Sequence, residues 1–160
     1  MDKVVRERLI EQYANGSAEL RAAWHEVPES ARTWRPADGE WSAHEIVVHC
    51  ADSETYAATR IRLLTAEPSP LIVGYDQERW ADTFAYHDQP VEMAMVVVAA
   101  VREHTTHLIR RLTDGQWNMS GTHTESGSYA ADDWLRTYAA HLHDHASQIR
   151  ENVTAWHVRS

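Results

Sequence analysis

The sequence predicts an all-α fold, a bundle of four helices around one core. Apolar residues recur at helical spacing in four segments, and there is no alternating strand pattern of useful length. A chain of 160 residues suits one domain, and its 43% hydrophobic and 24% charged residues are ordinary for a globular protein. We therefore expect a single domain over residues 1–160, with one long crossover between the second and third helices.

The first helix is expected from about Lys3 to Val27. Apolar residues from Val5 to Trp24 lie near one stripe at 100° per residue. Gly16 falls in the middle of this segment, where a glycine weakens a helix by about 1 kcal/mol relative to alanine. The next stretch, PESARTWRPADGEW, holds two prolines and a glycine and is typical of a loop.

The second helix has the clearest start signal in the chain. Ser42 can cap it, and Glu45 stands three residues later, which is the spacing of a reciprocal capping box. Trp41 before the cap and Ile46 after it have the spacing of a hydrophobic staple. We expect this helix to continue to Ala66, where the sequence PSP follows shortly after and stops it.

The remaining elements are predicted from the glycines and prolines that interrupt helices and from the spacing of apolar residues. Residues 68–90 form a long connection with a short helical segment, QERWADTFA, inside it, and long ordered connections often cover or line a site. The third helix is expected over about Val91 to Leu112, followed by a glycine-punctuated loop. The fourth is expected from near Ser128 to about His157, with two aspartates in or near its first turn.

Composition excludes several classes of function. The formal net charge of −9 argues against nucleic acid as a partner. The single cysteine, Cys50, excludes an internal disulfide and is expected to be a buried, inert thiol. The N-terminus has no signal-peptide pattern, and the longest apolar run, Met93 to Val101, is too short to cross a membrane. We therefore expect a cytoplasmic protein without a membrane partner.

The segment HLHDHASQI carries the most direct chemical signal. His141 and His145 stand four residues apart, so they lie about 40° apart on one helix face. Tyr138 and Ile149 continue the same stripe, which indicates that the pair faces the core. His143 lies about 200° from His141 and is expected to face solvent. By itself, the inward pair fits two hydrogen-bonded core histidines as well as two metal ligands.

A third histidine favours the metal. In the second helix His49 shares a mostly inward face with Ser53, Tyr56 and Arg60. Helical bundles build metal sites from side chains that project inward from facing helices. Three protein ligands would leave coordination positions open, as in catalytic zinc sites. Imidazole ligands also suit nickel, iron and copper, so we expect a divalent metal such as Zn, Ni or Fe.

Other histidine patterns are rejected on geometry or polarity. The segment HEIVVH resembles a zinc-protease motif, but His44 and His49 are five residues apart and diverge by about 140°. His44 is expected to be exposed in the first turn. The spacing of His104 and His107 permits chelation, yet their polar surroundings favour a solvated or interface face. Ordinary surface positions are expected for the others: His25, His87, His123 and His157.

Two motifs together resemble the DinB superfamily, the DinB/YfiT-like metalloenzymes. They are RPADGEWSAHEIVVHCADSE, which opens the second helix, and HLHDHASQI, some ninety residues on. The resemblance implies an up-down-down-up bundle, frequent homodimers, and three metal ligands that fall on His49, His141 and His145. Many members of the family carry a histidine just before the final ligand. Asp144 stands there in this chain, so a role carried by that position does not transfer.

The resemblance also guides the expected function. We expect a metal-dependent enzyme with thiol S-transferase-like chemistry, in which a low-molecular-weight thiol attacks an electrophilic small molecule. Tyr56, Arg60 and Tyr138 are expected to contact the substrate, and Trp80 and Trp134 to line a pocket. The alternatives are metal-dependent hydrolysis, for which the sequence assigns no general base, and a non-catalytic metal-binding or small-ligand-binding dimer.

Overall fold

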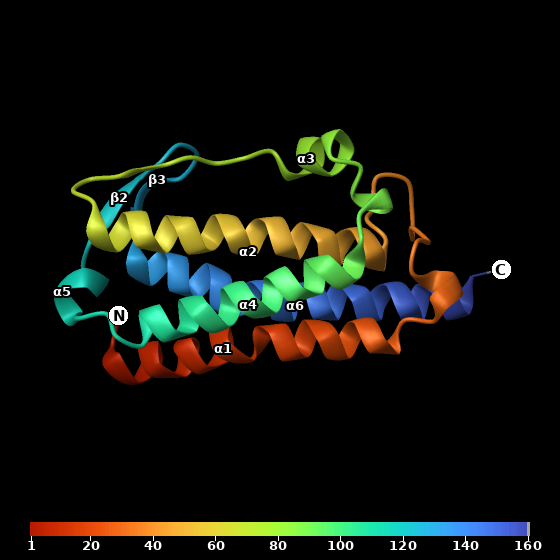
Figure 1. The fold of residues 1–160 in the computed structure, drawn as a ribbon, viewed down its shortest axis with the longest axis horizontal. Coiled ribbons are helices and arrows are strands. Elements are labelled where there is room, and N and C mark those ends of the chain that lie inside the picture. Colours follow the sequence, from red (N-terminus) through yellow and green to blue (C-terminus); the bar gives the residue numbers. More distant parts are fainter. Residues whose placement is uncertain (160) are drawn as a thin grey trace.

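Four long helices form the bundle in the computed structural model, which describes residues 1–159 (Figure 1). They are α1 (Lys3–Glu26), α2 (Ala43–Ala66), α4 (Val91–Ile109) and α6 (Ala131–Val158). Figure 1 shows α1 and α6 running in one direction and α2 and α4 in the other, which confirms the up-down-down-up topology. Each of α1 and α2 packs against both α4 and α6.

The start of α2 is fixed as predicted. The backbone N–H of Glu45 donates to Ser42 Oγ at 3.3 Å, and the Glu45 carboxylate accepts from the Ser42 backbone N–H at 2.9 Å. Arg35 also donates to that carboxylate, through Nε at 2.9 Å. The Trp41 ring, just before the cap, lies 4.7 Å from the His49 ring. The cap therefore sets the rotation of the helix that carries His49.

Gly16 has a different role from the one that helix propensity indicates. It is buried within α1, and a Cβ at this position would lie 3.0 Å from Arg102 Nη1 and 3.1 Å from Leu142 Cβ. The missing side chain therefore lets α4 and α6 approach α1 closely. Sequence alone showed the cost of this glycine to the helix but not the contact that requires it.

Three short strands were not predicted. Strand β1 (Leu71–Ile72) pairs in parallel with β2 (Ser120–His123), and β2 pairs antiparallel with β3 (Gly127–Ala130). Strands of two to four residues are too short for an alternating pattern to be recognised. Because residues 128–130 belong to β3, α6 begins at Ala131, three residues after its predicted start.

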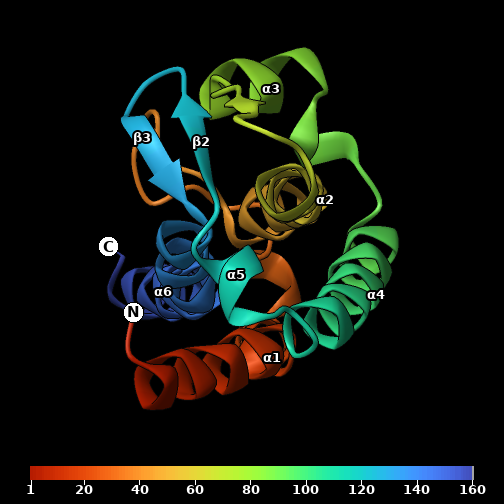
Figure 2. The ribbon, with the colours of Figure 1, turned by 90° about the vertical axis from the view of Figure 1, so that its left-hand side faces the viewer.

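The crossover carries short helices, as expected. Helix α3 (Gln77–Thr83) and the 3₁₀ turn η2 (Tyr86–Asp88) both contact α2. Figure 2 shows α3 and the β2–β3 hairpin on the same side of the bundle, beyond α2 and α6. Two further short elements are η1 (Glu29–Ala31) and α5 (Asp114–Trp117). Within residues 1–159, none of the helices combines the length and the apolar character needed to span a bilayer.

The buried apolar side chains form two clusters along the bundle. On α2 one cluster extends to Ala51 and the other begins at Ala57, while on α6 they meet between Ala139 and Leu142. The buried polar side chains of Glu54 and Arg102 lie between the two clusters, as does His141, whereas His49 and His145 stand at the adjoining end of the first cluster. The core is therefore interrupted by a polar layer directly beside the predicted histidine site.

Candidate metal centre

The three predicted histidines converge. His49 projects from α2, and His141 and His145 project from successive turns of α6. The ring centroids are 5.6 Å apart for His49 and His141, 4.9 Å for His49 and His145, and 4.6 Å for His141 and His145. Each ring offers a nitrogen, and these nitrogens all lie within 4.8 Å of one another. Nitrogens that share one tetrahedral zinc ion at about 2.1 Å lie about 3.4 Å apart, so the three rings must draw closer together when an ion binds.

The surroundings keep two of the rings neutral. Burial, together with the neighbouring His145 and His141, lowers the pKa of His49 to about 2. Burial and His141 lower the pKa of His145 to about 4. Both rings are therefore uncharged at neutral pH, which is the form that binds a metal ion. The side chain of His141 keeps 16% of its surface exposed, so the cluster is accessible from outside.

Hydrogen bonds orient the two histidines of α6. His141 Nδ1 lies 3.3 Å from Glu54 Oε1, and His145 Nδ1 lies 2.9 Å from Gln148 Oε1. Because a carboxylate can only accept, His141 donates its Nδ1–H to Glu54. Ser53 Oγ lies 3.2 Å from His141 Nε2. Partners on Nδ1 make Nε2 the metal-binding atom of both rings, as in the outer shell of many metal sites, and a bound ion would displace the Ser53 hydroxyl from His141 Nε2.

His49 supplies a further sign that a cation fits here. Its Nδ1 is buried, and among residues 1–159 it has no hydrogen-bond partner. Buried polar atoms are almost always paired with protein, water or an ion. An orphaned nitrogen beside two oriented imidazoles fits a divalent metal held by His49, His141 and His145. Such a set of three neutral nitrogen ligands leaves positions for an exogenous molecule.

The ion pair of Glu54 and Arg102 was missed at the sequence level. Both side chains are buried, with 0% and 1% of their surfaces exposed. A signal was present, because Glu54 stands between the apolar positions Cys50 and Ile61 on α2, and Arg102 follows Val98 by four residues on α4. Opposite charges within the apolar stripes of two helices predict a buried pair, although not which charges meet.

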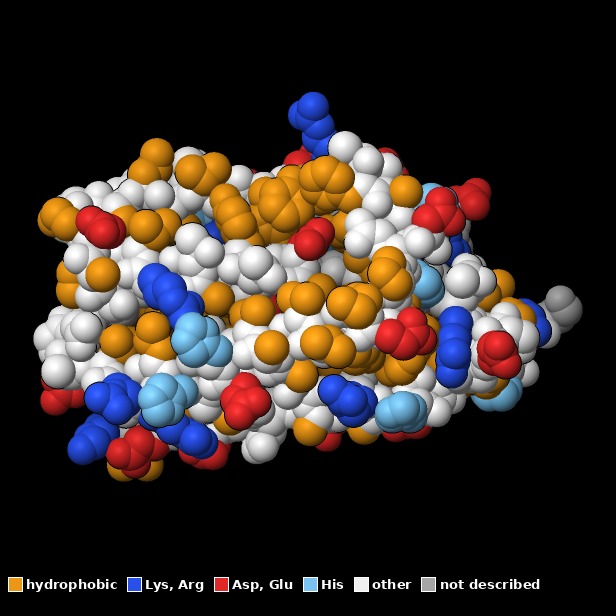
Figure 3. Space-filling view, in the orientation of Figure 1, with side chains coloured by type: hydrophobic (Ala, Val, Ile, Leu, Met, Phe, Trp, Pro, Cys, Tyr) orange, Lys and Arg blue, Asp and Glu red, His pale blue; other side chains and the backbone are white. Residues whose placement is uncertain are grey.

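The predicted substrate residues lie in one group beside the histidines. The Tyr138 ring is 5.7 Å from the His141 ring, and Arg60 Nη1 donates to Tyr138 Oη at 2.9 Å. The Arg60 guanidinium lies 4.6 Å from the centre of the Tyr56 ring. Tyr56 in turn lines a cleft of about 440 Å³ with aromatic side chains from the crossover, among them Trp80. Figure 3 shows hydrophobic side chains gathered over this part of the surface.

Two histidines are less exposed than predicted. His143 is half-buried and its Nε2–H donates to the Gln12 carbonyl at 3.0 Å, because α1 packs along this side of α6. His44 is also half-buried and donates to the Gln89 carbonyl at 2.8 Å. The exposed positions expected for other histidines are confirmed: His25, His87, His104, His107 and His157. The buried thiol of Cys50 is also confirmed.

Two further predictions were wrong. Trp134 lines no pocket, since it is fully buried and its Nε1–H donates to the Ala57 carbonyl at 2.9 Å. His123 is buried rather than on the surface, because it lies in β2 and its ring is 5.4 Å from that of Tyr129. The unpredicted sheet explains the burial of His123. Trp80, by contrast, lines the cleft as expected.

The fold and the histidine centre define a four-helix-bundle protein with a three-histidine candidate metal site. The family model described as the DinB superfamily matches residues 12–149. The chain therefore belongs to the DinB superfamily.

Relatives in curated collections carry related names. A protein of Oceanobacillus iheyensis named "putative metal-dependent hydrolase" is 30% identical over 111 residues, which cover 69% of this chain and 64% of that protein. A second protein of this organism, with the same type of name, is 29% identical over 144 residues, or 88% of this chain and 79% of the relative. This chain thus spans less than two thirds of the first relative. Both relatives thus carry the name of putative metal-dependent hydrolases.

Solved structures confirm the fold. The structure of YfiT from Bacillus subtilis, described as a "probable metal-dependent hydrolase with an unusual four-helix bundle topology", matches with a TM-score of 0.90. The identity is 23%, and the match covers 98% of this chain and 90% of YfiT. A mycothiol-dependent maleylpyruvate isomerase matches with a TM-score of 0.72 at 10% identity, over 90% of this chain and 60% of the isomerase.

Proposed function

We propose that this chain is a metal-dependent enzyme in which a low-molecular-weight thiol attacks an electrophilic small molecule. The observation that carries the proposal is the convergence of three histidines, two of them held neutral, with ligand nitrogens within 4.8 Å of one another. A divalent metal ion bound there would lower the pKa of a thiol in its open position and so supply a nucleophile at neutral pH. Zinc, nickel and iron all suit the ligand set.

The state of the nearby carboxylates favours a thiol over water as the nucleophile. A hydrolytic water is usually activated by a general base within hydrogen-bond reach. Glu54 is already bound by Arg102 and His141, and Glu45 is bound by Arg35 and the helix cap. Neither carboxylate is free to accept a proton from a substrate. A thiol that ionises in the site needs no such base.

In this proposal Tyr138, Arg60 and Tyr56 bind the electrophile. Tyr138 Oη accepts a hydrogen bond from Arg60, and burial raises the pKa of Tyr138, so its hydroxyl keeps a proton to donate to a substrate oxygen. Tyr56 connects this group to the aromatic cleft, which can hold an apolar substrate body. In the reaction the sulfur bonds to the electrophilic carbon, the displaced group leaves with the electron pair, and the thiol proton passes to solvent.

Hydrolysis is the second candidate, favoured by the names of the relatives and by Asp52. This residue stands one turn after His49 on α2 and is half-buried. The Tyr86 hydroxyl donates to Asp52 Oδ2 at 2.6 Å. Burial and the Asp52 carboxylate raise the pKa of Tyr86, so this hydrogen bond persists at neutral pH. Asp52 could act as a general base only after Tyr86 moves away.

The test starts from protein purified without a histidine tag, with its metal content measured by elemental analysis. Zinc-, nickel- and iron-loaded samples are assayed with a panel of bacterial thiols and 1-chloro-2,4-dinitrobenzene, and separately with p-nitrophenyl acetate and no thiol. We expect turnover of the first substrate that depends on both metal and thiol. Thiol-independent ester cleavage as the sole activity would favour hydrolysis instead.

The matched control is Tyr138→Phe, which removes one hydroxyl and keeps the ring beside His141. This variant is expected to keep its metal and lose turnover. If no metal-loaded sample turns over any substrate and metal removal unfolds the protein, the metal has a structural role and the proposal fails. The homodimer and the cytoplasmic location stay predictions, to be tested by light scattering on purified protein and by cell fractionation.

A further inference from the structure

An ion pair lies at the centre of the bundle, in the polar layer between the two apolar clusters. Glu54 on α2 and Arg102 on α4 have 0% and 1% of their side chains exposed. Removing two charges from water is costly, and pairs of this kind are often less stabilising than apolar residues of similar volume. A buried pair at this level therefore points to a role other than stability.

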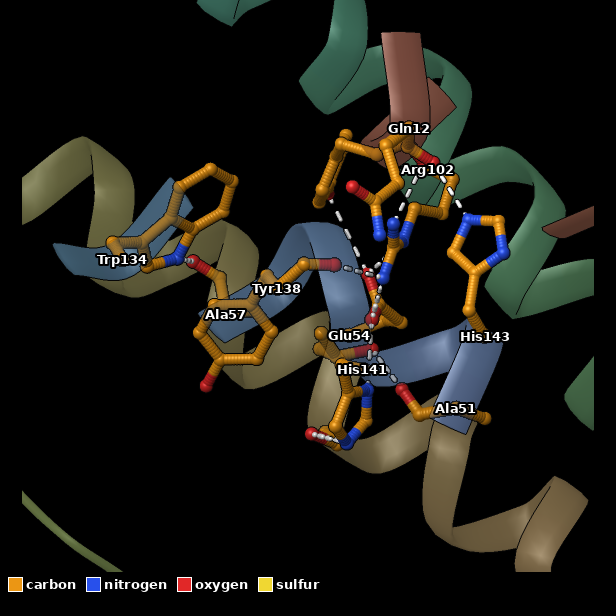
Figure 4. Close-up of polar contacts among 12 residues, drawn as sticks. Gln12, Ala51, Glu54, Ala57, Arg102, Trp134, Tyr138, His141 and His143 are labelled. Carbon is orange, nitrogen blue, oxygen red and sulfur yellow. Dashed lines mark hydrogen bonds and ion pairs between the residues drawn. The ribbon is translucent and has the colours of Figure 1, made fainter. Parts of the chain in front are cut away.

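Arg102 joins all four long helices. Its Nε and Nη2 donate to the two oxygens of Glu54 at 2.5 and 2.6 Å. Nη1 donates to the Tyr13 carbonyl of α1 at 2.7 Å. Nη2 also donates to the Tyr138 carbonyl of α6 at 2.9 Å (Figure 4). The bidentate contact fixes the plane of the Glu54 carboxylate.

The same carboxylate reaches the metal centre. Glu54 Oε1, which accepts from Arg102, lies 3.3 Å from His141 Nδ1. A carboxylate held in this position by a guanidinium stays ionised and can only accept, so the proton of His141 is kept on Nδ1. His145 has a neutral amide partner, Gln148, and no partner of His49 Nδ1 lies within the described residues. His141 is thus the ring with a charged orienting partner.

We propose that the Arg102–Glu54 pair is a positioning device for His141. The pair holds the proton on Nδ1 and keeps the ring in the orientation in which Nε2 faces the metal. It also connects α1 and α4 to a centre whose ligands come from α2 and α6. The consequence for metal binding rests on the proposed function, whereas the tautomer and orientation of His141 do not. Glu54 and Arg102 are positioning residues here, since neither contacts the metal.

The first experiment removes the pair without leaving a lone buried charge. The double variant Glu54→Met with Arg102→Met is expected to fold, because apolar side chains of similar length replace both partners. Its affinity for zinc, measured by competition with a chelator, should fall by about 10- to 100-fold, the usual effect of losing an orienting partner. Glu54→Gln with Arg102→Met keeps an acceptor for Nδ1–H and should recover part of that loss.

A control separates positioning from stability. Leu135→Ala opens a cavity in the second apolar cluster, away from the histidines, and should lower stability while leaving zinc affinity unchanged. The proposal is overturned if the double methionine variant binds zinc as tightly as the parent protein. It is also overturned if Leu135→Ala weakens zinc binding as much as the double variant does.

The second experiment uses metal-free protein, so it does not depend on the proposed function. Nitrogen-15 NMR of the imidazoles is expected to show His141 with its proton on Nδ1 in the parent protein and a mixture of tautomers in the double methionine variant. A parent protein with the proton on Nε2 would overturn the proposal. If the parent protein binds no metal, the proposed function fails, while this measurement still decides the positioning role.

Discussion

Replacing Arg102 alone with methionine tests the energetics of the polar layer. The change removes four hydrogen bonds of 2.5–2.9 Å and leaves the Glu54 carboxylate buried without its cation. Breaking a buried pair in this way costs about 3–5 kcal/mol. A domain of this kind has a total stability of roughly 5–15 kcal/mol, so the variant should be folded but weak. At this chain length the melting temperature should fall by roughly 6–20 °C.

The pH dependence of this loss has a definite sign. Burial by itself raises the pKa of Glu54, but the charge of Arg102 and the hydrogen bonds from His141 and Arg102 outweigh it and leave the pKa lowered. A lowered pKa gives stability that is present above the unfolded value of about 4.3 and is lost as the pH falls. Without Arg102 the effect of burial dominates and the pKa rises, so the variant loses stability as the pH rises. The difference in the free energy of unfolding between parent and variant should therefore be larger at pH 8 than at pH 5.

Urea denaturation of metal-free protein, followed by tryptophan fluorescence and circular dichroism, measures both quantities. We expect an unchanged dependence on urea concentration and a lower midpoint, since the surface exposed on unfolding is the same. A loss below about 1 kcal/mol at pH 8, which is typical of an exposed pair, would refute the reasoning. A loss that is the same at both pH values would contradict the assignment of its pH dependence to Glu54.

Three further outcomes are expected. His49→Ala should abolish bound metal while the fold is kept, and full metal content by elemental analysis would contradict the assignment. Gly16→Ala should destabilise the protein in urea, because a Cβ 3.0 Å from Arg102 and 3.1 Å from Leu142 overpacks the core by about 1–3 kcal/mol, against a gain of up to about 1 kcal/mol in helix propensity. Metal-free protein should lose stability below pH 6.5, since the lowered pKa values of His49 and His145 mean that protons bind the unfolded chain first. The slope of the free energy of unfolding against pH approaches about 1.4 kcal/mol per pH unit for each ring. A urea midpoint that stays the same between pH 7 and pH 5 would show that the rings are charged in the folded protein.

Local patterns predicted the four long helices and two of the histidines that cluster in the structure. The capping box at Ser42 and Glu45 depends on residues three apart, and the inward pair His141 and His145 on residues four apart, so both are visible in a short window. The convergence with His49 followed from helix faces. The parallel course of α2 and α4 could not be predicted in this way, because nothing in a short window fixes the direction of a helix that follows a long crossover. That prediction came from the family resemblance.

Features that depend on neighbouring elements could not be predicted. His143 was expected in solvent because its angle on α6 was considered without α1, which covers that side. The strands consist of short segments that lie far apart in the chain and are defined only by their pairing. Arg102 and Glu54 are separated by 48 positions. A charged residue within an apolar stripe is predicted to be buried, but the pattern does not indicate which residue of opposite charge it pairs with.

The net charge of the three-histidine centre with a metal bound indicates which kind of ligand it would accept. The three imidazoles bring no charge when they bind a metal ion, and the negative charge of Glu54 is already offset by Arg102. A divalent ion would therefore keep most of its charge, and Arg60, beside Tyr138, adds another positive group nearby. In a site of low dielectric this excess favours an anion in the open position. A thiolate meets that requirement, and so does an electrophile that carries a carboxylate, whereas a cationic substrate would be repelled.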